Sequence, residues 1–178
     1  MAWRLSAATV ALAIAAASVS AHAAPAAPAF RVTLLDRAEV VDSRERFGER
    51  VIVLRFQASW CKRCVAESAA LSRVTDRYKS RGVQVIALHV QDTAADARRF
   101  VRRYKPTYAV ALDPQLTIGN RFGFKGTPYT VVIDRKGEMV ARLHGESVVN
   151  RLPRILDEVL GDTPAPAPAP AVTPAPAR

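Results

Sequence analysis

The stretch Val51-Ile-Val-Leu-Arg-Phe-Gln-Ala-Ser-Trp-Cys-Lys-Arg-Cys64 decides the fold of this chain of 178 residues. Its first six residues are mostly β-branched or apolar, which predicts a buried strand, and the residues after Cys61 have helical spacing. The only two cysteines, Cys61 and Cys64, therefore lie where a strand is followed by a helix. A helix N-terminus favours an anion, and Lys62 and Arg63 add positive charge beside it, so we expect a stabilised thiolate at Cys61.

This placement predicts a redox pair. Cys61 leads the helix and is expected to be the more exposed nucleophile, while Cys64, one turn further in, would resolve the mixed disulfide. The alternative is an inert structural disulfide. A bridge across three residues closes too small a loop to remove much entropy from the unfolded chain, so it would stabilise the fold poorly.

The two ends of the chain differ from its middle. Residues 1–23 are typical of a secretory signal, with Arg4 as the positive charge, an apolar stretch at 5–19 and a small-x-small cleavage site at Ala21-His22-Ala23. A retained membrane anchor is the alternative, although the stretch is short and mostly alanine. Residues 24–29 are interpreted as a flexible lead-in, 30–161 as one compact domain, and 162–178, with six prolines, as a disordered Ala/Pro-rich tail.

The chain is basic, with a formal charge of +10, of which Arg4 is the only contribution from residues 1–23. Such a balance could attract nucleic acid, anionic lipid or acidic proteins, and by itself identifies no partner. Five basic residues cluster at 98–105 on one side of a predicted helix. They are interpreted as a solvated face, and with no nucleic-acid motif around them no nucleic-acid partner is expected.

Between the ends, strand-like and helix-like segments alternate, which predicts an α/β fold with largely buried strands. The expected strands are 30–35, 51–56, 83–90, 110–112, 129–134 and 138–144, the last two joined as a hairpin through Arg135-Lys136-Gly137. The expected helices are 61–79, 93–104, a turn or more at 118–122, and 147–160.

Helical spacing identifies one further functional candidate, Glu67, which shares a helix side with Leu71, Val74 and Tyr78. It therefore faces the core, three residues beyond Cys64. Burial favours the neutral form of a carboxyl group, which would let Glu67 exchange protons with a thiol. The alternative is a structural ion pair with a base on the preceding strand.

Two blocks of the sequence resemble a known family. The run from Phe56 to Cys64 (FQASWCKRC), with Glu67 after it, resembles the active site of thioredoxin-like proteins, specifically the exported thiol:disulfide oxidoreductases of the TlpA/ResA type. The block from Phe122 to Gly137 (FGFKGTPYTVVIDRKG) resembles the stretch that carries the cis-proline of that family. The resemblance implies a thioredoxin fold, a central mixed β-sheet flanked by helices, here with N-terminal extension strands.

The resemblance also implies roles at the cysteines. Cys61 and Cys64 match the attacking and resolving cysteines, Trp60 matches the flanking aromatic residue, and Glu67 matches the buried acid typical of this branch. No bound cofactor and no metal are implied besides the cysteine pair itself.

On the substrate side, Pro128 matches the cis-proline that shapes the groove, and the backbone of Thr127 would pair with an extended substrate peptide. Composition alone would favour an ordinary trans proline at the start of a strand.

Two residues depart from the family pattern. Arg63 stands where most relatives have proline, and its cation should stabilise the thiolate and make the disulfide more oxidising. Arg55 stands where relatives have a polar or acidic residue, and on a central strand it needs a partner, for which Glu67 is the candidate. If the two pair, the proton-relay role of Glu67 is weakened.

The function that the resemblance implies is periplasmic reduction of disulfides in exported client proteins, such as those of cytochrome c or copper-site assembly. Electrons would come from a membrane thiol carrier of the CcdA/DsbD type. Two alternatives stay open: the reverse direction, as a disulfide oxidase or isomerase, which Arg63 favours, and a copper(I)-binding chaperone that uses the two soft thiolates. The copper alternative lacks further soft ligands, because Met139 is the only methionine after the first residue and His89 and His144 are distant from the cysteines in sequence.

Overall fold

The computed structural model describes residues 24–35, 39–145 and 148–161. The predicted signal sequence and the proline-rich tail lie outside these ranges. Among the described residues, no helix combines the length and the apolar character needed to cross a membrane.

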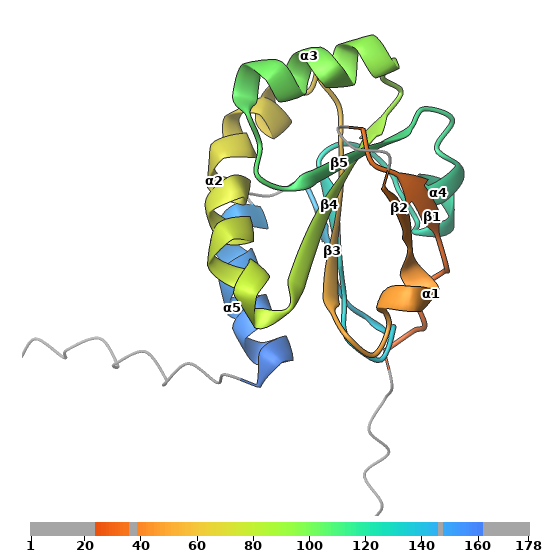
Figure 1. The fold of residues 1–178 in the computed structure, drawn as a ribbon, viewed down its shortest axis with the longest axis vertical. Helices are drawn as coiled ribbons and strands as arrows, with labels where there is room; N and C mark the ends of the chain where they lie inside the picture. Colours follow the sequence, from red (N-terminus) through yellow and green to blue (C-terminus); the bar gives the residue numbers. More distant parts are fainter. Residues whose placement is uncertain (1–23, 36–38, 146–147, 162–178) are drawn as a thin grey trace, which may run out of the picture.

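A five-stranded mixed sheet forms the centre of the domain (Figure 1). Its strand order is β5-β4-β3-β6-β7; β3 runs parallel to β4, and β4 to β5, while β6 is antiparallel to both β3 and β7. The strands are β3 (Val51–Gln57), β4 (Val83–Val90), β5 (Ala109–Asp113), β6 (Tyr129–Ile133) and β7 (Met139–His144). The predicted thioredoxin-like mixed sheet is thereby confirmed, including the hairpin between β6 and β7.

Helices cover the sheet unequally. Helices α2 (Lys62–Tyr78) and α5 (Val148–Leu160) cover one face, and α3 (Ala94–Tyr104) lies across the end of the sheet where α2 begins (Figure 1). The other face carries α4 (Thr117–Arg121), α1 (Ser43–Arg46) and a separate two-stranded sheet of β1 (Arg31–Thr33) and β2 (Val40–Asp42). A 3-10 turn, Lys79–Arg81, follows α2.

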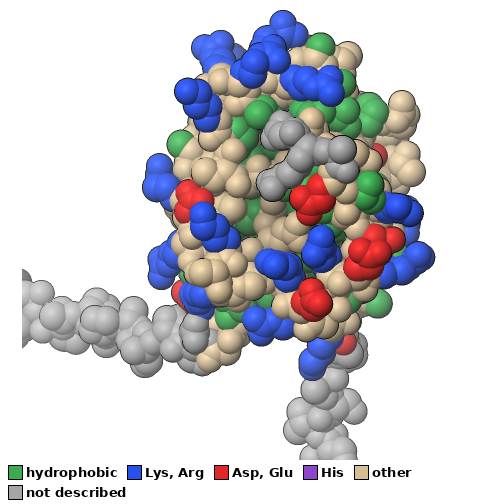
Figure 2. Space-filling model, viewed as in Figure 1, with side chains coloured by type: hydrophobic (Ala, Val, Ile, Leu, Met, Phe, Trp, Pro, Cys, Tyr) green, Lys and Arg blue, Asp and Glu red, His purple; other side chains and the backbone are tan. Residues whose placement is uncertain are grey.

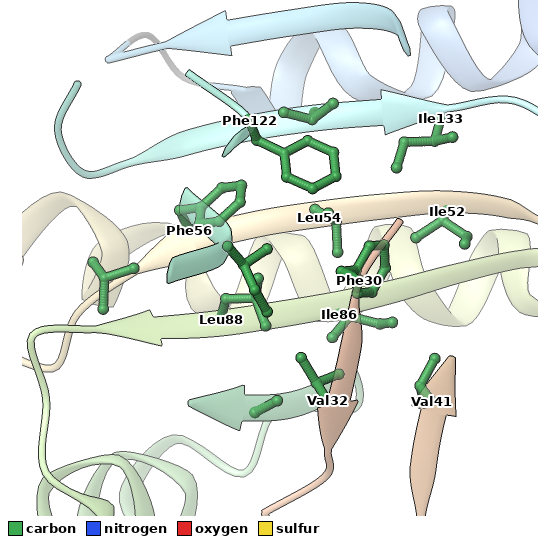
Figure 3. Close-up of a cluster of buried hydrophobic side chains, with 14 of the residues drawn as sticks. Phe30, Val32, Val41, Ile52, Leu54, Phe56, Ile86, Leu88, Phe122 and Ile133 are labelled. Atoms are coloured by element: carbon green, nitrogen blue, oxygen red, sulfur yellow. The ribbon is translucent and has the colours of Figure 1, made fainter. Parts of the chain in front are cut away.

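The alternation of strand β3 builds a core on each face of the sheet. Ile52, Leu54 and Phe56 belong to the cluster that includes residues of β1 and β2 (Figure 3), whereas Val51 and Val53 pack with residues of α2 and α5. Every residue of β3 is buried, as expected for a central strand covered on both faces. Arg55 shares the parity of Val51 and Val53, so its side chain lies on the α2 face.

The N-terminal part differs from expectation. The predicted strand at 30–35 is the shorter β1, and its partner β2 and the four-residue α1 had no counterpart in the sequence analysis, because elements this short show no measurable periodicity. The segment 24–29, predicted as a flexible lead-in, is hydrogen-bonded to the start of β7: Ala27 N–H donates to the Gly137 carbonyl at 2.8 Å, and Met139 N–H to the Pro25 carbonyl at 2.8 Å. These contacts pair backbone groups that a packed sheet edge would otherwise leave unsatisfied.

Candidate active site

The cysteine pair is held at the junction that the sequence predicted. Cys61 is the N-cap of α2, and its Sγ accepts the Cys64 N–H at 3.2 Å. The two cysteines form a disulfide with their Cα atoms 5.2 Å apart. Cys61 is 7% exposed and Cys64 1%, so the leading sulfur belongs to the residue nearer the solvent, as predicted.

The rim of the disulfide is aromatic and basic. Trp60 is 60% exposed, and Lys62 and Arg63 are exposed on the first turn of α2. Both cations therefore flank the helix N-terminus where a thiolate would form, which is the placement that their predicted tuning role requires.

The cis-proline loop meets the same end of the sheet. The Thr127–Pro128 peptide bond is cis, as the resemblance implied, and it directly precedes β6. Because Tyr129 of β6 pairs with Phe56 near the C-terminal end of β3, the loop lies at the end of the sheet where the chain passes from β3 to the cysteines. A depression of about 420 Å³ opens beside it, lined by Lys125, Gly126, Thr127, His144 and Gly145.

Arg55 and Glu67 form the ion pair that the sequence analysis offered as the alternative to a proton relay. The Arg55 Nη2 donates to Glu67 Oε2 at 2.5 Å, and its Nη1 donates to Thr130 Oγ1 at 3.1 Å. The Arg55 side chain is 1% exposed and that of Glu67 12%. Burial lowers the pKa of Arg55, and the contact with Glu67 opposes that shift. A role for Glu67 in proton transfer stays a prediction.

A second group of buried polar side chains supports the loop before the cysteines. Asp92, which follows β4, accepts the Ser59 backbone N–H at 2.7 Å and the Ser59 hydroxyl at 2.9 Å. The same carboxylate lies 2.7 Å from Nδ1 of His89, and Nε2 of that ring lies 2.9 Å from the Gln57 amide nitrogen. The ends of β3 and β4 are thus joined by a chain of hydrogen bonds that reaches within two residues of Cys61.

The contacts of His89 are satisfied by one tautomer of its neutral ring. The Gln57 amide nitrogen can only donate, so Nε2 accepts, and Nδ1 carries the proton that it donates to Asp92. Burial lowers the pKa of His89, against the opposing effect of Asp92. The His89 ring is fully buried, and it packs edge-to-face with the ring of Phe100 from α3, with the two ring centroids 4.9 Å apart. The neutral imidazole is therefore the form that fits this site.

No motif in the sequence indicated this network. Its further members are Ser68 and Tyr108, whose hydroxyls lie 2.8 Å apart, one turn along α2 from Cys64. Burial raises the pKa of Tyr108, against its hydrogen bonds to Ser68 and Gln57. The available signal for these residues was that polar side chains occur inside, or directly after, apolar strand segments. That pattern matches no known motif. Among the described residues, no three His, Cys, Asp or Glu side chains are grouped to hold a metal ion.

These features define a class of protein. A disulfide across three residues, at the start of a helix that follows a central strand and beside a cis-proline loop, is the site of a thioredoxin-like protein that exchanges thiols and disulfides.

Comparison with known proteins agrees with this class. The Redoxin family model matches residues 22–160, so the chain belongs to the Redoxin family. The thiol-disulfide oxidoreductase ResA of Bacillus anthracis is 30% identical over 133 residues, which cover 75% of this chain and 76% of that protein. ResA of Bacillus thuringiensis subsp. konkukian is 29% identical over the same length and shares of the two chains.

Solved structures show the same likeness. A candidate thiol:disulfide interchange protein DsbE from Chlorobium tepidum matches with a TM-score of 0.71 and 27% identity, covering 80% of this chain and all of that one. A candidate thioredoxin from Neisseria meningitidis matches with a TM-score of 0.70 and 26% identity, covering 78% and 92%. The chain is therefore a thiol:disulfide oxidoreductase of the TlpA/ResA type, as the sequence motifs predicted.

Proposed function

We propose that this chain is exported to the periplasm and there reduces disulfides of other exported proteins. The observation that carries the proposal is the disulfide at the N-terminus of α2, whose leading sulfur accepts the Cys64 N–H. The same N–H and helix dipole would stabilise a thiolate on Cys61 in the reduced protein. The signal-like residues 1–23 and the relatives named thiol-disulfide oxidoreductase ResA support export and this chemistry.

The reaction starts from the reduced protein. The Cys61 thiolate attacks one sulfur of a client disulfide; the client S–S bond breaks, a bond between Cys61 and the client forms, and the first client sulfur leaves as a thiolate that takes up a proton. Cys64 then loses its proton and attacks the Cys61 sulfur. The mixed disulfide breaks, the second client sulfur leaves as a thiol, and the Cys61–Cys64 disulfide of the structure remains. Two electrons have passed to the client, and no bound cofactor is needed.

The surrounding residues would assist these steps. The Thr127 backbone beside Pro128 would hold an extended client segment, and exposed Trp60 would contact it. Glu67, three residues from Cys64 on α2, would accept the proton of the resolving thiol, in a role that its ion pair with Arg55 weakens.

The source of electrons and the clients follow from the resemblance. A membrane thiol carrier of the CcdA/DsbD type would reduce the disulfide again after each turnover. Clients would be exported proteins whose cysteines must be reduced before they bind haem or copper, as in cytochrome c or copper-site assembly.

The reduction potential tests the direction of transfer. In a full-length W3F background Trp60 is the only tryptophan, so its emission can be titrated in dithiothreitol and glutathione buffers. A value of about −270 mV is expected for a reductant, and a value of about −120 mV would refute reduction in favour of oxidation. The matched variant R63P removes a cation at a position where the first helical turn tolerates proline, and its potential should fall by about 30 mV or more.

A further inference from the structure

Helix α3 presents a basic surface. Arg98, Arg99, Arg102 and Arg103 are all exposed, and Asp96 is the only acidic residue of the helix. Asp96 is already bound, since it accepts the Thr93 hydroxyl at 2.6 Å and contacts the Arg99 guanidinium at 2.5 Å. In Figure 2 lysine and arginine side chains gather along the upper rim of the molecule, where Figure 1 places α3.

Two of these arginines adjoin the cysteine loop. A depression of about 170 Å³ is lined by Ser59 together with Asp96, Arg99, Phe100, Arg103 and Tyr104. Ser59 lies two residues before Cys61, and Asp92 fixes its backbone and hydroxyl. On the other side Phe100 packs against buried His89, so α3 is anchored to the same end of the sheet. Arg99 and Arg103 are thus held beside the redox site by the core, rather than on a free segment.

The other borders of the cysteine pair are basic too. Lys62 and Arg63 are exposed on the first turn of α2, and Lys125 lines the depression beside Thr127. The nearby carboxylates are occupied: Asp92 is bound by Ser59 and His89, and Glu67 by Arg55. Asp96 is bound by Thr93 and by one nitrogen of Arg99, whose other N–H groups remain donors. A client that approaches Cys61 therefore meets positive charge on several sides.

We propose that Arg99 and Arg103 bind an acidic segment of the client protein next to the disulfide that Cys61 attacks. The inference rests on the proposed function and specifies its substrate class. A guanidinium group can form a bidentate pair of hydrogen bonds with a carboxylate. Complementary charge also raises the association rate of two proteins. A protein is the occupant that this site favours, because the occupant must bring a sulfur to Cys61 and offer apolar surface to exposed Trp60.

The test compares two disulfide-bonded peptides that differ only in flanking residues, glutamate in one and glutamine in the other. The reduced full-length chain is mixed with each, and the second-order rate constant of reduction is measured at low and at physiological salt. We expect the acidic peptide to react roughly tenfold faster at low salt, with the advantage shrinking as salt rises. Equal rates for the two peptides would overturn the inference.

Matched variants locate the effect. In R99Q/R103Q the preference for the acidic peptide should disappear, and in R103Q, which leaves the contact between Arg99 and Asp96 intact, it should already fall. In R98Q/R102Q, which loses the same charge from the same helix outside the depression, most of the preference should persist. An equal loss in both double variants would refute the assignment to this depression. Far-UV circular dichroism of both variants checks that they keep their helices.

Two further measurements distinguish failure of the proposed function from failure of the inference about Arg99 and Arg103. Uncharged hydroxyethyl disulfide reports on the chemistry alone: if the wild-type chain reduces neither it nor either peptide, the proposed function fails and the inference with it. Vesicles containing phosphatidylglycerol test a lipid partner. Vesicle binding that R99Q/R103Q abolishes, together with equal peptide rates, would assign the surface to a membrane instead of a client.

Discussion

Replacing Glu67 by glutamine removes the carboxylate that contacts the Arg55 guanidinium inside the domain. The Arg55 side chain is 1% exposed, so water cannot solvate its guanidinium group when the Glu67 carboxylate is lost. Breaking a buried ion pair from one side costs about 3–5 kcal/mol, because an uncompensated charge is left behind. R55M removes the buried charge and leaves the Glu67 carboxylate, which is 12% exposed, and the Thr130 hydroxyl without the guanidinium, so it should cost less than E67Q.

The double variant R55M/E67Q separates the pair from its parts. With the buried cation gone, no uncompensated charge is left inside the domain, so the double variant should be more stable than E67Q, although the hydrogen bond to Thr130 is lost. Urea unfolding of the oxidised proteins at pH 7 measures all four free energies. The matched control is E158Q in the exposed pair with Arg154, whose side chains are 52% and 80% exposed and whose loss should cost below about 1 kcal/mol. An E67Q cost no larger than that of E158Q, or a double variant no more stable than E67Q, would refute the reasoning.

The same variants test the proton-relay role. E67Q should slow release of a client from the mixed disulfide, whereas R55M keeps the carboxyl group and should release it faster than E67Q. Stopped-flow measurement of the resolving step makes the comparison. Equal slowing in both variants would show that the pair acts only by supporting the fold.

Further predictions concern the rest of the site and the fold. In D92N an amide nitrogen, which donates, replaces one of the two carboxylate oxygens that accept hydrogen bonds from Ser59, so these bonds are weakened. The free energy of unfolding should fall by about 1–3 kcal/mol, and the Trp60 emission of the folded protein should shift. Burial lowers the pKa of His89, so below about pH 6.5 the unfolded chain binds a proton that the folded chain excludes. The free energy of unfolding should therefore fall as the pH drops below about 6.5, by up to about 1.4 kcal/mol per pH unit. Urea titrations of H89Q should lack that part of the slope. C64S should accumulate a mixed disulfide with clients, visible on non-reducing gels and by mass spectrometry; no trapped species would contradict Cys61 as the attacking residue. G137A should destabilise the fold more than G48A in thermal unfolding: both glycines have positive φ, but only at residue 137 would an added Cβ come within 3.2 Å of the Phe47 ring.

Much of the site could be predicted from short patterns. The apolar run of β3 and the helical spacing after Cys61 located the strand, the helix and the cysteines at their junction, and all three are in the structure. Arg55 and Glu67 could be proposed as partners because a charge on a fully buried strand needs a counter-charge, and helical spacing turned Glu67 towards that strand. The cis peptide before Pro128 came from resemblance alone, since composition favoured an ordinary proline.

Other parts depend on residues that are distant in the chain. Ser59 and Asp92 are 33 residues apart, and Gln57 and His89 are 32 apart, yet the parallel register of β3 and β4 brings their ends together. Likewise the arginines of α3 border the cysteine loop because Phe100 packs on His89. Such contacts carry no local signal, because a polar residue at the end of a strand looks the same whether it faces water or a partner.

By itself the amino-acid sequence determined the elements of the centre, the order in which they occur and the position of the cysteine pair, because local periodicity and a three-residue cysteine spacing are readable along the chain. Only the tertiary structure decided which buried polar groups support the cysteine loop and which surface charges a client would meet. Strand register and helix packing bring those groups together, and both arise from burial of the whole core rather than from any single segment.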